Sequence, residues 1–332
     1  MHLATRAGIA AALLCGAALL SVSPTLAQAN PKEIAARVEL HAFPSLTLSD
    51  QQFLSGDAGG KPVTMTGEFR IAQGTGRLPV VILMHGSGGI GANIEPWTRT
   101  FNAMGVSTFT IDGFSGRGLT SVNTDQASLG RLNFILDIYR ALELLPRHSR
   151  VDPDRIALMG FSRGGQAALY ASLTRFHKMW NKSGAQFAAY IPFYPDCATS
   201  YAGETEVAAK PIRIFHGIPD DYNPVASCKP YIQRLREAGH DVGLTEYPEA
   251  QHGFDTPLNV GAVIVAAGAQ TVRGCKVREA EGGVLLNVST SQPFSYKDGC
   301  VQLNPHVGGN AAATQAARIA VTDFVRQVFR LE

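Results

Sequence analysis

The sequence contains the pentapeptide Gly160-Phe161-Ser162-Arg163-Gly164, with an apolar run before it (155–159) and a helix-forming run after it (166–172). This order predicts a serine on a sharp turn between a strand and a helix. Glycine fits the positions two before and two after the serine, because any side chain there would collide across the turn. The turn would lift the hydroxyl above the sheet edge, where the N-terminus of the helix favours developing negative charge. Ser162 is therefore the candidate nucleophile.

Outward from this turn, apolar runs alternate with amphipathic segments along the chain. The expected strands are 66–71, 80–84, 106–111, 156–160, 187–193, 212–215 and 242–247, and the expected helices are 95–104, 126–145, 224–238 and 312–329. Such alternation predicts an α/β fold, in which a mostly parallel central sheet is covered by helices on both faces. Residues from 255 to about 311 break the rhythm and contain two cysteines, which predicts an insertion with a hairpin-like element.

The first residues, 1–29, have the features of a secretory signal peptide. They contain one basic residue, Arg6, no acidic residue, an apolar stretch from 7 to 20, and small residues at Ala27 and Ala29. The apolar stretch is shorter than the roughly 20 residues that a membrane span needs. We expect cleavage after Ala29, a periplasmic or secreted mature chain, and no membrane span further along.

The cysteine count agrees with export. Beyond the signal peptide an even number remains, namely Cys197, Cys228, Cys275 and Cys300, and an oxidising compartment favours their pairing. Of the possible connectivities we favour Cys197–Cys228 and Cys275–Cys300. Metal binding is the alternative, but the sequence contains no CxxC pair and no HExxH motif.

The charge balance argues against two classes of partner. The formal net charge is +2 at pH 7, and basic residues do not form runs. This distribution lacks the electrostatic signature of a protein that binds nucleic acid or an anionic membrane. The sequence gives no indication of the oligomeric state.

A second glycine-rich stretch, His85-Gly86-Ser87-Gly88-Gly89, directly follows the strand expected at 80–84. Acyl transfer generates an oxyanion, and backbone N–H groups must already point at it. We expect the amides of Ser87 and of Arg163, the residue after the nucleophile, to form this oxyanion hole. An ordinary glycine-rich loop is the alternative, whereas a phosphate-binding loop is disfavoured because no Gly-Lys-Ser/Thr follows.

The base and its acid partner are expected further along, each in a loop after a strand. Asp220 and Asp221 follow the strand at 212–215, and His252 follows the strand at 242–247. A neutral imidazole can take the serine proton and later return it, and a carboxylate holds that imidazole in the right tautomer. One of the aspartates, Asp221 in particular, could instead cap the helix at 224–238. The order serine, aspartate, histidine is typical of α/β-hydrolases.

Four stretches resemble the dienelactone hydrolase family of α/β-hydrolases: 80–86, 151–156, 160–165 and 251–255. The resemblance extends over roughly 66–255 and the last helix. It implies a single α/β-hydrolase domain over 30–332, with Ser162 as nucleophile, His252 as base and Asp220 as acid, since the spacing of Asp220 to its neighbours matches the family pattern. The enzymes that give the family its name use a cysteine, so this chain resembles a serine-nucleophile member.

These residues predict an exported serine hydrolase that cleaves small-molecule carboxylic esters through an acyl-enzyme, with no cofactor and no metal. Phe114 and Arg117, in the stretch 112–118 after an expected strand, are candidates for lining the substrate cleft; a plain loop is the alternative. The Arg163 side chain could contact an anionic acyl group, although a surface salt bridge is its more common use.

Two other functions share parts of this pattern. A peptidase of the prolyl-oligopeptidase type uses the same catalytic sheet, but the stretch between 30 and 66 leaves no room for its large propeller. A non-catalytic protein could keep the fold for binding alone, although all three positions of the expected triad are filled.

Overall fold

The computed structural model describes residue 2 and residues 30–331, so the predicted cleavage site and nearly all of the predicted signal peptide lie outside the described residues. The main strands are β1 (Arg37–Thr47), β2 (Lys61–Ile71), β3 (Leu78–Met84), β4 (Ser107–Asp112), β5 (Val151–Phe161), β6 (Ala189–Phe193), β8 (Ile212–Gly217) and β9 (Val242–Tyr247). The α-helices are α1 (Asp50–Ser55), α2 (Ile94–Ala103), α3 (Asn133–Leu144), α4 (Arg163–Tyr170), α5 (Thr174–Trp180), α6 (Val225–Glu237) and α7 (Ala311–Phe329).

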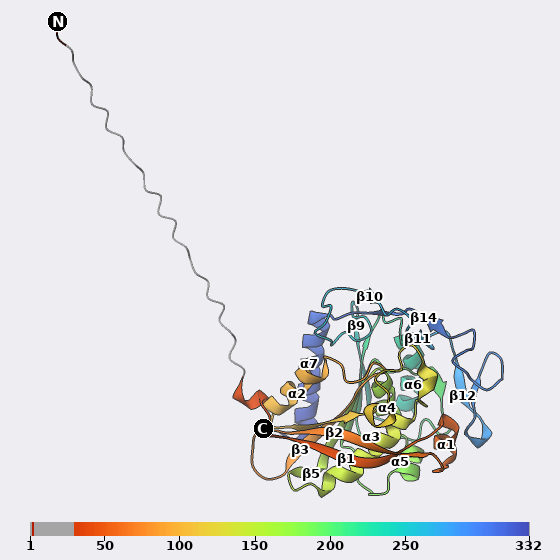
Figure 1. The fold of residues 1–332 in the computed structure, drawn as a ribbon, viewed down its shortest axis with the longest axis horizontal. Coiled ribbons are helices and arrows are strands. Elements are labelled where there is room, and N and C mark those ends of the chain that lie inside the picture. The colour runs from red at the N-terminus through yellow and green to blue at the C-terminus, as the bar shows by residue number, and fades with distance from the viewer. Residues whose placement is uncertain (1, 3–29, 332) are drawn as a thin grey trace.

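The main strands form one sheet of eight, in the order β1-β2-β4-β3-β5-β6-β8-β9. β2 pairs antiparallel with both β1 and β4, and every other neighbouring pair is parallel. Helices lie on both sides of this sheet (Figure 1). The predicted α/β class, with a mostly parallel sheet between helices, is confirmed.

Strand β3 shows how the sheet separates two apolar layers. Val80, Ile82 and Met84 belong to one layer and Val81 and Leu83 to the other, because successive side chains of a strand point to opposite faces. Helices α3, α4, α5 and α6 contribute to the first layer, and α2 and α7 to the second (Figure 1). A central strand buried on both faces has a continuous apolar run, which is why this strand was predictable.

The helix expected at 126–145 begins only at Asn133, so its first part is a wrong prediction. Gln126–Ser128 form a 3-10 turn, and Gln126 donates its backbone N–H to the side chain of Gln270. Gly130 lies so close to the Leu48 carbonyl that a Cβ would be 2.8 Å from its oxygen. These contacts hold the segment in an irregular path before the helix.

The residues of the predicted insertion form several short strands. β12 (Val277–Glu279) and β13 (Leu285–Asn287) are antiparallel, and β12 also runs parallel to β7 (Thr199–Ser200). Two further antiparallel pairs join β10 (Ile264–Val265) to β15 (His306–Val307) and β11 (Gln270–Thr271) to β14 (Gln302–Leu303). The segment is therefore more extensive than the single hairpin expected.

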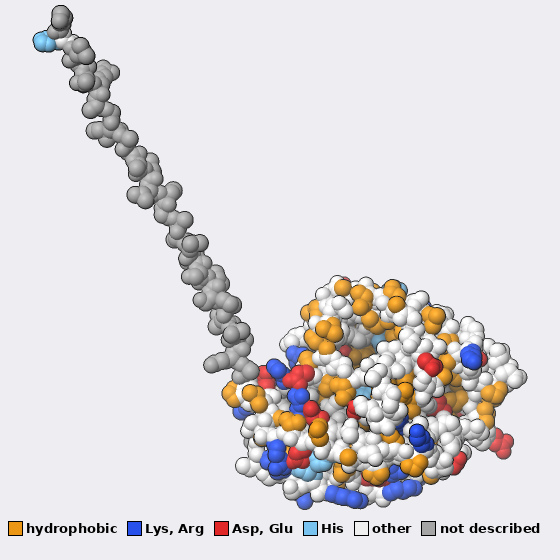
Figure 2. All heavy atoms as spheres, viewed as in Figure 1, with side chains coloured by type: hydrophobic (Ala, Val, Ile, Leu, Met, Phe, Trp, Pro, Cys, Tyr) orange, Lys and Arg blue, Asp and Glu red, His pale blue; other side chains and the backbone are white. Residues whose placement is uncertain are grey.

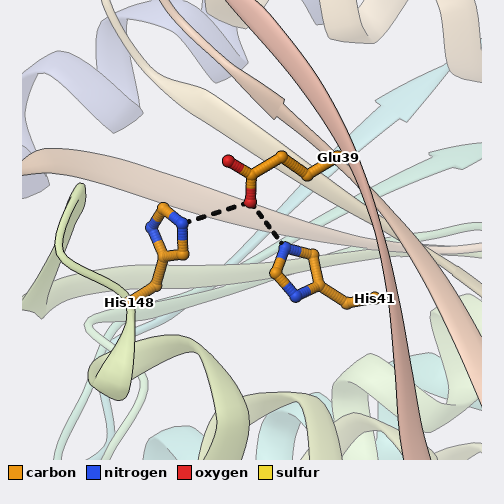
Figure 3. A group of neighbouring side chains, drawn as sticks. All are labelled: Glu39, His41 and His148. Carbon is orange, nitrogen blue, oxygen red and sulfur yellow. Dashed lines mark hydrogen bonds and ion pairs between the residues drawn. The ribbon is translucent and has the colours of Figure 1, made fainter.

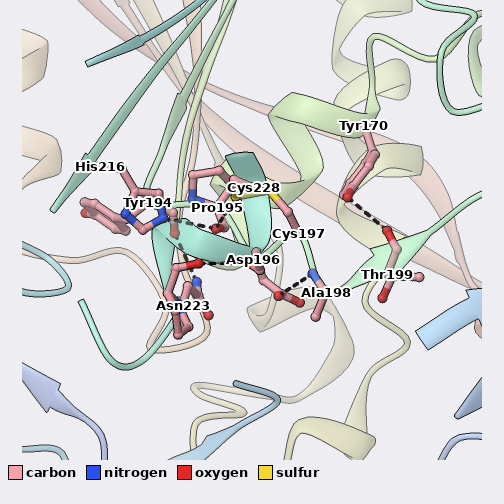
Figure 4. The surroundings of a disulfide bond; sticks show 12 residues. Tyr170, Tyr194, Pro195, Asp196, Cys197, Ala198, Thr199, His216, Asn223 and Cys228 are labelled. Carbon is pink, nitrogen blue, oxygen red and sulfur yellow. Dashed lines mark hydrogen bonds between the residues drawn. A yellow bond between two sulfur atoms is a disulfide. The ribbon is translucent and has the colours of Figure 1, made fainter. Parts of the chain in front are cut away.

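Two disulfides have the connectivity favoured from the sequence. Cys275–Cys300 closes a loop within the insertion. Cys197–Cys228 joins the loop after β6 to the first turns of α6 (Figure 4). In the same place the Asn223 side chain donates to the Tyr194 carbonyl, so the two loops are held together by a covalent and a polar contact.

Replacing both Cys275 and Cys300 by serine is expected to lower the free energy of unfolding by about 3 kcal/mol. The bridge joins positions 25 residues apart, and in the chain-entropy model its loss gives the unfolded chain that much more freedom. Urea unfolding of the double variant and of the wild type would measure the difference. An unchanged midpoint would show that other contacts already restrain this loop in the unfolded chain.

Candidate active site

Ser162, Asp220 and His252 lie together at the carboxyl edge of the sheet, in the loops after β5, β8 and β9. The Nε2 atom of His252 is 2.9 Å from the Ser162 hydroxyl oxygen, and its Nδ1 atom is 2.8 Å from an Asp220 carboxylate oxygen. Because a carboxylate only accepts, Nδ1 carries the proton and Nε2 is left to accept the serine proton. The structure thus brings the three predicted residues into one chain of hydrogen bonds.

The backbone fixes the orientation of the Asp220 carboxylate. Its Oδ1 atom accepts the N–H groups of Tyr222 and Asn223 at 2.9 and 2.8 Å, which leaves Oδ2 for His252. Asp220 is 3% exposed, so these donors replace the water that it would otherwise bind.

Asp221 points away from His252 and toward the insertion. Its Oδ2 atom accepts from Arg273 at 2.6 Å and from the His306 ring at 2.9 Å. The alternative that Asp221 caps the following helix does not hold, because α6 begins after Pro224 without a side-chain cap. Asp221 instead connects the loop after β8, which also contains Asp220, to the insertion.

The backbone at Ser162 has the strained conformation expected of a sharp turn. Its φ is 55° and its ψ is −116°, a region that residues other than glycine rarely adopt. A Cβ on Gly160 would be 2.0 Å from the Gly164 carbonyl oxygen, and one on Gly164 would be 2.2 Å from the Met84 carbonyl oxygen. Helix α4 packs this closely on β5 and β3 only because both positions lack a side chain.

The loop after β3 lies directly against Ser162. A Cβ on Gly86 would be 3.2 Å from the Ser162 Cβ, and Ser87 lines the same cavity as Ser162 and Arg163. Arg163 is the first residue of α4, and the first N–H groups of a helix have no partner within it. The two residues predicted for the oxyanion hole are therefore neighbours of Ser162.

Two tyrosines that the sequence did not reveal surround the His252 ring. Tyr222 stacks on it with ring centres 4.5 Å apart, and Tyr194 contacts it edge-on at 4.7 Å. Tyr194 donates its hydroxyl to the Asp255 carboxylate at 2.6 Å, and burial raises the pKa of both groups. The one sequence feature that could have indicated either tyrosine was the position of Tyr222, two residues after Asp220.

A small cavity of about 30 Å³ opens beside Ser162. Its walls are polar on the core side, where Gln126, Arg131 and Asp196 lie, and the insertion adds Thr271 and Tyr296. Arg131 donates to Asp196 at 2.6 Å and to the Tyr296 hydroxyl at 3.0 Å. The insertion therefore forms part of the wall of the site.

The Arg163 side chain is buried beneath this cavity, and the expectation of a surface salt bridge is wrong. It donates to the Gln126 side chain at 3.0 Å and to the Leu129 carbonyl, and its guanidinium carbon is 5.5 Å from the centre of the Phe134 ring. Burial lowers its pKa to about 10. Contact with an anionic acyl group stays a prediction.

The prediction that Phe114 and Arg117 line the substrate cleft is also wrong. Phe114 is 2% exposed and packs against the rings of His85 and Phe134. Arg117 forms a buried ion pair with Asp137 at 2.7 Å. Neither residue lines the cavity at Ser162, because both side chains turn into the protein interior.

Among the described residues, Glu39, His41 and His148 form a group with the spacing of metal ligands (Figure 3). One Glu39 oxygen lies 2.9 Å from His41 Nε2 and 3.2 Å from His148 Nε2. The Nδ1 atom of His148 accepts the Arg150 N–H. A neutral His148 ring therefore carries its proton on Nε2, the atom that faces Glu39. A metal would need a free lone pair on that same atom. We therefore interpret the cluster as the Glu39 carboxylate hydrogen-bonded to two histidines, between β1 and the loop after α3, and not as a metal site.

The comparisons with known proteins agree with this geometry. The profile of the dienelactone hydrolase family matches residues 68–273. This chain belongs to the dienelactone hydrolase family. The matched segment includes Ser162, Asp220 and His252 and ends inside the insertion, and the predicted resemblance is confirmed.

Three proteins to which this chain is similar have low sequence identity to it. Probable carboxylic ester hydrolase LipM of Mycobacterium tuberculosis is 28% identical over an alignment of 163 residues, and the match covers 36% of this chain and 38% of LipM. The chain thus spans less than half the length of that relative. The dienelactone hydrolase-like promiscuous phosphotriesterase P91 from metagenomic libraries has a TM-score of 0.54 at 15% identity, with 87% of this chain and 98% of P91 covered. A thermophilic esterase of Thermogutta terrifontis with bound butyrate has a TM-score of 0.47 at 18% identity, with 57% and 80% covered.

The described part of the chain contains no helix with the length and apolar character of a membrane span. On the face shown in Figure 2, acidic and basic side chains are interspersed with apolar ones. This distribution agrees with the balanced charge of the sequence.

Arg117→Ala is expected to lower stability by about 3–5 kcal/mol, because it leaves the buried Asp137 carboxylate without its cation. Urea unfolding would measure the loss. Arg70→Ala is the matched control, since it removes ion pairs with Glu68 and Glu95 that are partly exposed and should cost less than about 1 kcal/mol. Normal stability of Arg117→Ala combined with a lower kcat/KM would restore the substrate-binding role.

Proposed function

We propose that this protein is an exported hydrolase of carboxylic esters that uses Ser162 as nucleophile, His252 as base and Asp220 as orienting acid. The single observation that carries the proposal is the chain of hydrogen bonds from the Ser162 hydroxyl through His252 to Asp220. The similarity to LipM, which is named a probable carboxylic ester hydrolase, supports the ester class.

The first half of the reaction forms an acyl-enzyme. The Ser162 oxygen attacks the ester carbonyl carbon while His252 Nε2 takes the hydroxyl proton, and Asp220 stabilises the resulting imidazolium. The carbonyl oxygen becomes an oxyanion that the amides of Ser87 and Arg163 stabilise. When the oxyanion collapses, the bond to the alcohol oxygen breaks, and that oxygen takes the proton from His252.

The second half of the reaction releases the acid with the same groups. A water molecule gives its proton to His252 and attacks the acyl carbon, and the same two amides stabilise the second oxyanion. The bond to Ser162 then breaks, and Ser162 recovers its proton from His252. Every step uses side chains and amides of this chain, so the reaction requires no metal or cofactor.

The two disulfides support the proposed export. The disulfides Cys197–Cys228 and Cys275–Cys300 are stable in oxidising compartments such as the periplasm, in agreement with the signal peptide predicted for residues 1–29. We propose one domain from residue 30 onward with an insertion at about 255–311. Contacts such as that of Arg273 with Asp221 join this insertion to the core.

Ser162→Ala and His252→Ala are each expected to lower kcat at least about 10⁴-fold on short esters, because the members of a triad act as a unit. His240→Ala is the matched control: this histidine bonds the Thr205 carbonyl, away from the site. Ester hydrolysis and labelling by a fluorophosphonate probe would be measured on folded proteins. If His252→Ala kept more than a few per cent of the activity, another residue would be the base.

The two neighbouring aspartates are expected to differ sharply. Asp220→Asn should lower kcat by about 10⁴-fold, because an amide partner favours the wrong tautomer of His252. Asp221→Asn should leave kcat largely unchanged and lower stability by about 1 kcal/mol, since its ion pairs are partly exposed. Equal losses of kcat in the two variants would contradict the assignment.

The stability difference between Asp221→Asn and the wild type should depend on pH. Burial alone would raise the pKa of Asp221, but hydrogen bonds from His306 and the charge of Arg273 lower it on balance. A carboxyl whose pKa is lowered in the folded protein stabilises that protein at pH values above its ordinary pKa. This stabilisation is lost as the pH falls through the pKa of the folded state. Urea unfolding at neutral and acidic pH would show the difference between the two proteins shrink on acidification.

A further inference from the structure

The cavity beside Ser162 has little room for a substrate. At about 30 Å³ it is far smaller than the roughly 300–1,000 Å³ of typical small-molecule sites. Most of the residues that line it are polar, with Gln126, Arg131 and Asp196 among them. A bulky apolar group attached to the ester carbonyl must therefore lie elsewhere.

A larger groove adjoins this cavity. Its volume is about 380 Å³, and it shares Gln126 and Tyr296 with the cavity at Ser162. Gln126 also donates its side-chain amide to the Ser87 hydroxyl at 3.1 Å. The groove thus begins one side chain away from the proposed oxyanion hole.

The walls of the groove are predominantly apolar. They include Ala127, Leu129, Val284, Leu285, Pro293 and Phe294. Asp50 is the one formally charged side chain among the residues that line it, and an Asp50 carboxylate oxygen accepts the Leu132 N–H at 3.0 Å. An uncharged apolar group fits this lining, because its binding removes apolar surface of the group and of the groove from water.

The wall formed by the insertion is held in position by contacts within the insertion and by contacts with the core. The Phe294 N–H donates to the Leu285 carbonyl at 2.8 Å, and the Gln51 side chain donates to the Gly282 carbonyl at 3.3 Å. Tyr296, at the boundary with the cavity, bonds Arg131. The groove is therefore formed before a substrate binds.

We propose that this groove binds an extended apolar group, alkyl or aryl, of the ester whose carbonyl lies at Ser162. The inference rests on the proposed function and adds the substrate class: esters with one long apolar substituent. Each methylene group buried in such a groove strengthens binding about fourfold. The substituent belongs either to the acid or to the alcohol, and esters that are extended on one side only separate these two sources.

The test fills the groove by Ala127→Trp and compares three esters. Ethyl acetate has two short substituents, hexyl acetate has a long alcohol, and ethyl octanoate has a long acyl chain. The variant should lower the ratio of kcat/KM for one of the long esters to that for ethyl acetate at least tenfold. Ser128→Trp is the matched control, because Ser128 is also exposed on the same 3-10 turn but does not line the groove.

The ester that responds identifies the side of the scissile bond that occupies the groove. Unchanged ratios for both long esters in Ala127→Trp, or an equal fall in Ser128→Trp, would overturn the groove inference while leaving the proposed function intact. Hydrolysis of all three esters that persists in Ser162→Ala, or no hydrolysis of any of them by the wild type, would overturn the proposed function and the inference with it.

Discussion

The close packing of helix α4 on strands β3 and β5 is the constraint on which the site depends. Without a Cβ at Gly160 and Gly164, the backbone of the helix approaches the strands to contact distance. The turn between them then holds Ser162 at a positive φ, with its N–H donated to the Phe193 carbonyl at 3.0 Å. Ser162, the proposed nucleophile, is thus positioned by backbone contacts with its own and neighbouring strands, which side-chain rotation cannot relax.

Two layers of contacts then orient the histidine. Asp220 holds one ring nitrogen, and the rings of Tyr222 and Tyr194 restrict the plane of the imidazole. The insertion takes part in the same arrangement, since the side chain of Thr271 donates to the Tyr222 carbonyl. The position of the His252 ring therefore depends in part on how the insertion packs against Tyr222.

The three residues of the proposed triad were predictable as a group because each lies in the loop after a strand of the parallel part of the sheet. The carboxyl ends of such strands meet at one edge, so Ser162, Asp220 and His252 had to be neighbours once the strands were recognised. The edge strand β1 was not predicted, because its exposed positions include apolar side chains such as Leu40, which is 80% exposed. Apolar and polar residues do alternate here, but the apolar members Val38, Leu40 and Ala42 are exposed, so the alternation does not mark the buried face of the strand.

Long-range polar contacts were the other part that the sequence could not reveal. Arg117 is one charged residue in a loop, and only the fold shows that the buried Asp137 of α3 is its partner. The start of α3 was misplaced for a related reason: Leu129 is buried against the core although it precedes the helix. Its apolar spacing continued the helical pattern, while the bond of Gln126 with Gln270 depends on a residue far along the chain.

The loop of His252 is held by residues that follow it by more than fifty positions. The His252 carbonyl accepts the Gly308 N–H at 3.1 Å, and the Phe254 carbonyl accepts the Asn310 N–H at 2.8 Å. During translation these donors leave the ribosome long after Ser162 has emerged. A chain shortened before residue 308 would therefore contain Ser162 but lack both backbone donors that hold the loop of His252.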